Sequence, residues 1–127
     1  MAKISKQSPI GTSFFSTTFK ATPNNLIKLF GEAEYGDNSG KNKTNLEWTL
    51  ETDDGKVFTI YDWKYYKPLN LNKEYEWHIG ARNREISEQA KLEVCNALID
   101  FYNSNINKHF KKLNKIKRLK EKLEKQL

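Results

Sequence analysis

The stretch that decides the fold is residues 46–63, which read LEWTLETDDGKVFTIYDW. Apolar and polar residues alternate over 46–51, as expected of a strand with one buried face. The Asp-Asp-Gly run at 53–55 is a turn signal, because Gly55 supplies the positive φ that a tight hairpin turn needs. Residues 57–63 return as the second strand. The stretch therefore predicts an antiparallel hairpin.

Two further strands and a short helix flank this hairpin in the sequence. Alternation predicts a third meander strand over 75–79, and a run rich in Thr and Phe predicts a strand over 12–20. Thr22 and Pro23 indicate a helix start, because the Thr hydroxyl caps a backbone N–H and proline lacks the N–H that would have no partner. Gly31 is typical of the end of that helix.

The C-terminal third is expected to hold two helices. Ser87 is a capping residue, followed by apolar residues at helical spacing. The segment Asn103–Asn107 is expected to weaken this helix, and a basic helix follows it. The predicted fold class is α+β, a small antiparallel meander sheet with two helices packed on one face, plus a basic C-terminal helix. The expected organisation is a flexible N-terminus (1–11), an α+β domain (12–105) and a basic helical extension (106–127).

The positive charge of the chain lies in the tail. The 127 residues are 37% hydrophobic with a mean hydropathy of -0.83. They indicate one domain with no membrane partner, because no run approaches the roughly 20 apolar residues of a span. Residues 108–127 hold nine basic and two acidic side chains, a net +7, whereas the whole chain carries +6. The tail residues singled out as a nucleic-acid contact or an interface are Lys111, Lys112, Lys115, Lys117, Arg118 and Lys120.

Three interpretations of this tail stay open: a solvated helix, an oligomerisation helix, and a binder of nucleic acid or an anionic surface. The single cysteine, Cys95, excludes a disulfide framework and a cysteine-cluster zinc site. We predict no cofactor and no metal. Residues 1–5 lack the apolar segment of a secretory signal, so a reducing, cytoplasmic setting is expected.

One acidic pattern imitates a nuclease site. Asp53 and Asp54 precede Asp62-Trp63-Lys64 at the spacing of restriction-type nucleases. Asp62 follows Asp54 by eight residues, which in a strand would separate the two by about 26 Å, too far to share a metal ion. We therefore interpret them as a turn residue and a strand-end residue, and we predict no catalytic residue and no enzymatic activity.

Several short motifs follow one another in a fixed order over residues 14–102. They are Phe30-Gly31-Glu32, Glu47-Trp48, Asp54-Gly55, Ile60-Tyr61-Asp62-Trp63-Lys64 and Trp77-His78-Ile79-Gly80. The set resembles the pattern of a large group of small proteins encoded by bacteriophages and other DNA viruses. Ala81 departs from the pattern, which usually has a second glycine there. The resemblance implies a homo-oligomeric viral protein of the host-cell cytoplasm, related to sponges that sequester cyclic-nucleotide signals of anti-phage defence (the anti-CBASS type).

Aromatic and basic residues gather after the second and third meander strands. Aromatic faces stack on bases, and Lys and Arg hold phosphates, so this mixture favours a nucleotide ligand. Trp48 and Trp77 are expected in the core instead. The predicted ligand-binding residues are Trp63, Lys64, Tyr65, Tyr66, Lys67, His78, Arg82 and Arg84.

The predicted function is therefore non-enzymatic binding and sequestration of a small anionic nucleotide signal of host defence. Two alternatives stay open. The first is a nucleic-acid-binding accessory protein that acts through the basic tail. The second is a protein–protein inhibitor of a host factor, with the exposed aromatic residues after the hairpin as its anchors.

Overall fold

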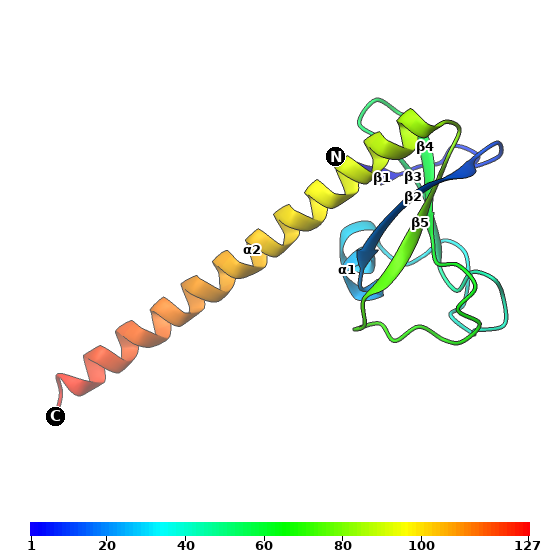
Figure 1. Cartoon of the computed structure of the whole chain (residues 1–127). Helices are drawn as coiled ribbons and strands as arrows, with labels where there is room; N and C mark the ends of the chain where they lie inside the picture. The colour runs from blue at the N-terminus through cyan, green and yellow to red at the C-terminus, as the bar shows by residue number, and fades with distance from the viewer. The chain divides into compact units, whose positions relative to one another are not determined.

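A five-stranded antiparallel sheet, in the order β1-β3-β4-β5-β2, forms the body of the protein (Figure 1). The structure is a computed structural model that describes residues 1–127. The α+β class is confirmed, but the predicted simple meander is wrong, because only the three central strands are neighbours in chain order. The strands are β1 (Lys3–Ile4), β2 (Ser13–Ala21), β3 (Glu47–Glu51), β4 (Val57–Tyr61) and β5 (Tyr75–Ala81).

The N-terminal residues take part in this sheet. β1 is a two-residue edge strand that pairs with β3, and we predicted no strand in this segment. Because β2 pairs with β5 at the opposite edge, residues 5–12 must cross three strands, about 19 Å, which eight residues can span. We call residues 5–12 the crossing segment. The Arg82 Nη2 donates to the carbonyls of Ser8 (3.1 Å) and Ile10 (3.3 Å), and these bonds hold the crossing segment in place.

The core lies on one face of the sheet. Trp48 and Trp77 are fully buried, as predicted, and their rings meet edge to face at 5.7 Å. Each indole N–H is satisfied, since Trp48 donates to the carbonyl of Gly31 (2.8 Å) and Trp77 to that of Ala21 (2.9 Å). Two large rings thus bury their apolar area without leaving a polar atom unpaired.

Helix α1 (Pro23–Phe30) forms as the sequence predicts. The Thr22 hydroxyl accepts from the backbone N–H of Asn25 at 3.2 Å, and proline occupies the first turn. Gly31 ends the helix with a φ of 84°, a conformation that glycine adopts without strain. The buried side of α1 carries Leu26 and Phe30.

Helix α2 (Arg84–Glu124) corrects two predictions about the C-terminal third. It begins before Ser87, because the Asn83 side chain accepts from the N–H of Ile86 (2.8 Å) and acts as the cap. It also runs unbroken through Asn103–Asn107, so one helix of 41 residues replaces the two that we predicted. The asparagines cost less than about 0.7 kcal/mol each, which is too little to break a cooperative helix flanked by strong helix formers.

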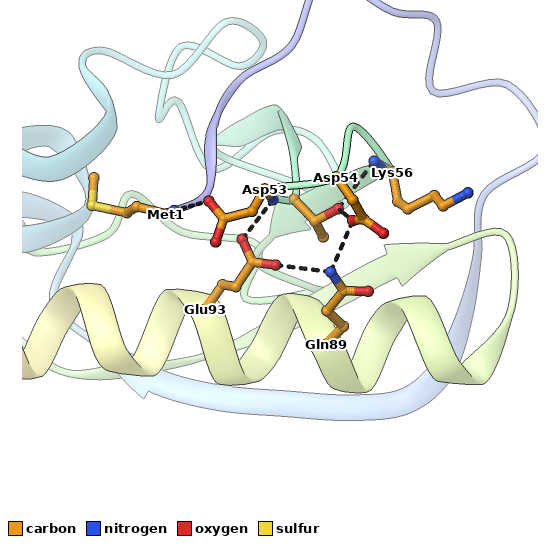
Figure 2. A network of polar contacts seen from close by, with 7 residues as sticks. Met1, Asp53, Asp54, Lys56, Gln89 and Glu93 are labelled. Atoms are coloured by element: carbon orange, nitrogen blue, oxygen red, sulfur yellow. Dashed lines mark hydrogen bonds and ion pairs between the residues drawn. The ribbon is translucent and has the colours of Figure 1, made fainter.

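The start of α2 is hydrogen-bonded to the hairpin turn between β3 and β4 (Figure 2). The Glu93 carboxylate accepts from the N–H of Asp53 (2.9 Å), and the Gln89 amide donates to Asp54 (2.9 Å) and to Glu93 (3.0 Å). The amino group of Met1 pairs with Asp53. Asp53 and Asp54 therefore belong to a structural turn, as we interpreted them.

The chain divides into two compact units, Met1–Ala97 and Leu98–Leu127, with the boundary inside α2. All strands, α1 and the first turns of α2 belong to the first unit. Neither helix combines the length and apolar character that a membrane crossing requires.

Candidate functional site

A pocket of about 350 Å³ opens on the face of the sheet opposite the tryptophan core. Its floor comes from the three central strands and its cover from the crossing segment and the start of β2. Trp63 and Thr44 complete the wall. The lining residues are Pro9, Ile10, Thr12, Ser13, Thr44, Glu47, Thr59, Tyr61, Trp63 and Gly80.

Strand alternation explains why these side chains share one face. Thr59 lies opposite Gly80, and Tyr61 lies opposite His78, in the register of β4 against β5. A Cβ at Gly80 would lie 2.5 Å from the Thr59 Oγ1, so only glycine fits here without displacing that hydroxyl. The absent side chain leaves space for the pocket at the centre of the sheet.

A bulge in β2 brings a further aromatic ring to this face. The register of β2 against β5 shifts between Phe14 and Thr18, and Ser16 takes a φ of 66° within the bulge. The Phe14 ring consequently stacks on the imidazole of His78, with 4.1 Å between centroids. Strand bulges are over-represented beside functional sites because they redirect side chains in this way.

Four rings form what we call the aromatic cluster: Phe14, Tyr61, Trp63 and His78. The Tyr61 ring meets those of His78 (5.4 Å) and Trp63 (6.0 Å) edge to face, and Trp63 stacks on His78 at 6.3 Å. Trp63 is 40% exposed, so part of the indole is open to a ligand.

Two ammonium groups flank the exposed indole. The Nζ atoms of Lys43 and Lys64 lie 5.9 and 5.5 Å from the Trp63 ring centroid, within the range of cation–π attraction. Two cations next to a partly exposed aromatic ring provide for a flat ring and for an anionic group attached to it.

Burial shifts the pKa values of three side chains, His78, Tyr61 and Glu47, in the direction that favours their uncharged forms. Burial lowers the pKa of His78, although the charge of Glu76 opposes the shift. Burial also raises the pKa of Tyr61, and Glu47 adds to the effect. Desolvation, followed by the charge of Glu34, raises the pKa of the Glu47 carboxyl. His78 and Tyr61 are therefore uncharged at neutral pH.

The loop after β4 is anchored by the buried carboxylate of Asp62. One of its oxygens accepts from the N–H groups of Asn45 (2.7 Å) and Leu46 (2.9 Å), and the other accepts from the Asn45 amide (3.0 Å). The Lys64 N–H donates to the carbonyl of Lys43 at 2.7 Å. These bonds tie the segment that carries Lys43 to the segment that carries Trp63 and Lys64, and they give Asp62 a structural role directly after β4.

Trp63, Lys64 and His78 are the predicted ligand residues that the structure brings together, since Lys64 and His78 both contact the Trp63 ring, but only Trp63 lines the pocket. Tyr65 packs edge to face on Tyr75 at 5.1 Å, and its hydroxyl accepts from a backbone N–H of β5 at 3.4 Å. The remaining predicted residues of this loop, Tyr66 and Lys67, are exposed and do not line the pocket.

The two predicted arginines occupy different places. Arg82 binds two carbonyls of the crossing segment and so positions the cover of the pocket. Arg84 is the exposed first residue of α2. Neither lines the pocket.

Sequence reasoning missed every lining residue of the pocket except Trp63, and it also missed Phe14 and Lys43 beside the aromatic cluster. The alternation of β4 and β5 contains part of the signal, because Thr59, Tyr61 and His78 fall on the same side once the hairpin register is set. Phe14 gives no comparable signal, since its direction depends on the bulge.

The six predicted tail residues lie in the second unit. Lys111, Lys112, Lys115, Lys117, Arg118 and Lys120 are all exposed on α2. Comparisons with protein-family models, with curated proteins and with solved structures find no match to this chain. The function is therefore argued from the geometry of the pocket and from the charge of the tail.

Proposed function

We propose that this protein binds and sequesters a small anionic nucleotide without converting it chemically. The observation that carries the proposal is the partly exposed indole of Trp63 at the wall of the pocket, with the ammonium groups of Lys43 and Lys64 within about 6 Å of its ring centroid. A base stacks on the indole, and the two ammonium groups hold the phosphate.

The pocket has the size and the polar groups for the rest of such a ligand. A volume of about 350 Å³ is at the small end of ligand pockets, which fits one nucleotide or half of a cyclic dinucleotide. Hydroxyls of Thr12, Ser13 and Thr59 line it and either donate or accept hydrogen bonds. The Glu47 carboxylate accepts from sugar hydroxyls or from an amino group on the base.

The proposed biological role is that of a viral accessory protein that removes a signal of host defence from the host cytoplasm. The motif resemblance supports this role, and the pocket supports the ligand class. The two can be tested separately, since nucleotide binding by the purified protein does not depend on the source of the ligand.

The direct test is calorimetric titration with adenosine and guanosine monophosphates, cyclic mononucleotides and cyclic dinucleotides. We expect saturable binding of at least one ligand and its intact recovery after the protein is denatured. Absence of binding to every ligand of the panel, or recovery of a cleaved product, would contradict the proposal.

Stacking is tested by a pair of substitutions at Trp63. Trp63→Phe keeps a π-face and Trp63→Leu keeps only apolar volume, so we expect Trp63→Leu to weaken binding more, by about 1–3 kcal/mol relative to the parent. Equal affinities for the two variants would exclude stacking on this ring.

Charge is tested by removing both ammonium groups. Lys43→Gln with Lys64→Gln should weaken nucleotide binding and reduce its dependence on salt. Lys28→Gln with Lys56→Gln removes the same charge at exposed positions that do not line the pocket, and it should leave affinity unchanged. A similar loss in both pairs would indicate a general effect of net charge.

A second function, nucleic-acid binding by the tail, is favoured by one observation. All nine basic side chains of residues 108–127 are exposed, eight of them on α2 and Lys125 directly after it. Binding through phosphate neutralisation falls steeply with salt, so affinity for a double-stranded oligonucleotide should drop at least tenfold between about 50 and 200 mM salt. Salt-insensitive binding would contradict this function.

A further inference from the structure

The second unit carries a row of exposed apolar side chains along α2. Within Leu98–Leu127, the row members up to Leu123 are 42% to 63% exposed, although each is a large apolar residue. Neighbouring members are three, four or seven residues apart. The members on α2 are Ile99, Tyr102, Ile106, Leu113, Ile116 and Leu123, and Leu127 follows the end of the helix.

This spacing is a heptad repeat carried by a continuous helix. Positions 99, 106, 113, 120 and 127 take the heptad place a, and positions 102, 109, 116 and 123 take the place d. Only His109 and Lys120 interrupt the apolar character. Apolar residues at a and d form the seam of a left-handed coiled coil. On α2 the row extends from Ile99 to Leu123, about 36 Å at 1.5 Å per residue.

We propose that this row docks on the same row of a second copy of the chain, as an antiparallel two-stranded coiled coil. The partner is a second copy because an a/d seam fits another a/d seam of the same spacing. Most of the basic residues, including Lys111, Lys115 and Arg118, take the outer places c and f. They stay in solvent when the seam closes.

The charges of the helix select the antiparallel direction. In a parallel pair, Lys112 at place g faces Lys117 at the next place e of the other copy, and Lys120 faces its own counterpart in the seam. Both contacts set like charges against each other. A parallel pair therefore carries repulsion at its flank and in its core.

The antiparallel pair removes both repulsive contacts. Layers then join an a residue to a d residue, so Leu113 packs on Ile116 of the second copy. Ile106 packs on Leu123 of the second copy in the same way. His109 falls beside Lys120, which places the two polar interruptions in one layer, where a neutral imidazole accepts a hydrogen bond from the ammonium.

The flanking places agree with this arrangement. Lys117 at place e lies beside Phe110 of the second copy, where cation–π attraction replaces repulsion. Lys112 at place g lies beside Leu119 of the second copy and covers it with its alkyl stem. Phe110 and Leu119, which are 58% and 54% exposed outside the a/d row, thereby also acquire a partner.

The first experiment measures the mass of the full chain by sedimentation over a range of concentrations, with two neighbouring substitutions. Leu113→Glu places a charge in the seam, whereas Asn114→Glu makes the same change of charge at the outer place b. We expect a dimer for the parent and for Asn114→Glu. Leu113→Glu should dissociate at least about a hundredfold more readily.

Circular dichroism shows whether each variant keeps its fold. A parent that is monomeric at about 100 μM, well above a micromolar Kd, overturns the proposal. A parent that forms a trimer also overturns it. Equal dissociation of the two variants also overturns it, because the seam would then not be the contact.

The second experiment determines direction by disulfide cross-linking. On a Cys95→Ser background, chains with Ile106→Cys are mixed with chains carrying Leu123→Cys and oxidised. The antiparallel pair predicts mainly the mixed 106–123 cross-link. Dominant 106–106 and 123–123 cross-links would show a parallel pair and overturn the proposed direction, and absence of any cross-link would overturn the seam.

Discussion

At the scale of single residues, the pocket depends on the absence of a side chain at Gly80 as much as on the side chains that line it. The Thr59 hydroxyl occupies the position next to the absent Cβ, 2.5 Å from where that atom would lie. Thr59 is 4% exposed and β-branched, so its hydroxyl cannot move far without disturbing its neighbours.

Gly80→Ala should therefore destabilise the protein by about 1–3 kcal/mol, as expected for an overpacked buried site. Thr59→Ala in the same chain removes the clash, so the double variant should recover part of that loss. Chemical denaturation of the two single variants and the double variant measures the coupling. Strictly additive losses would mean that the two residues do not meet.

His78 gives the pocket a dependence on pH. Burial lowers its pKa below the ordinary 6.5, so the unfolded chain binds the proton more readily than the folded one. Folding stability is then highest above pH 6.5 and falls as the pH drops from there toward the lowered pKa of His78.

His78→Phe keeps a ring to stack on Phe14 and removes this titration. As the pH falls from about 8 to about 5, roughly one and a half units on either side of the ordinary histidine pKa, the free energy of unfolding should fall more for the parent than for the variant. Urea denaturation at several pH values measures both. Parallel curves for the two proteins would refute a role for His78 in the pH dependence.

The residues of the pocket and of the aromatic cluster beside it differ in how well the sequence predicts them. Trp63, Lys64 and His78 belong to local motifs that mix aromatic and basic character, and these were predicted. Glu47 and Phe14 reach the pocket only through strand pairing over long distances and through the bulge at Ser16. Such long-range registers and irregularities have no local pattern.

At the scale of elements, the local chemistry of caps and turns explains most of the boundaries. Thr22, Pro23 and Gly31 define α1 as predicted, because a cap depends on a few adjacent residues. The predicted start of α2 was wrong because Asn83 and Ser87 are both of a type that caps helices. Only the structure shows that Asn83 is the residue that caps α2. The expected break at 103–107 failed because weak propensities do not overcome helix cooperativity.

The hairpin turn before β4 gives a prediction at this scale. The Thr52 hydroxyl, which donates to Asp54 at 2.5 Å, lowers the pKa of that carboxyl below 3.8, with Gln89 adding to the effect. Any stability from this lowered pKa is present above pH 3.8 and is lost as the pH falls through the lowered value.

Thr52→Val should therefore raise the pKa of Asp54, and Gln89→Ala should raise it less. Thr52→Ser keeps the hydroxyl and should leave the pKa low. NMR titration of the Asp54 carboxyl carbon distinguishes the three variants. An unchanged pKa in Thr52→Val would show that the hydroxyl does not act on this group.

At the scale of the whole molecule, sheet topology was the largest error of sequence reasoning. The hairpin and the third strand follow from alternation, but nothing local indicates that β1 and β2 take opposite edges. The consequence is functional, because the crossing segment that this order requires becomes the cover of the pocket. Arg82, chosen in the sequence as a ligand residue, instead holds that cover in place.

The division of the chain into two units predicts how a shortened chain behaves. All five strands, α1 and nearly all of the buried core lie within Met1–Ala97, and every residue from Tyr102 to Leu127 is exposed. A chain that ends at Asn105 keeps this core and about two turns of α2 beyond the last buried side chain, Leu98. We expect it to unfold cooperatively and to bind the same nucleotides as the full chain.

The shortened chain should differ from the full chain in its response to concentration. Without Leu113, Ile116 and Leu123 it lacks the seam, so it should be a monomer whose melting temperature does not depend on concentration. The full chain, as a dimer, should melt higher as its concentration rises, because association stabilises only the folded state. Thermal melts over a hundredfold range of protein concentration compare the two chains. Over such a range, mass action adds about 2.7 kcal/mol to the stability of an associating protein. An unfolded shortened chain would show that the tail supports the core, and a concentration-independent full chain would show that it does not associate.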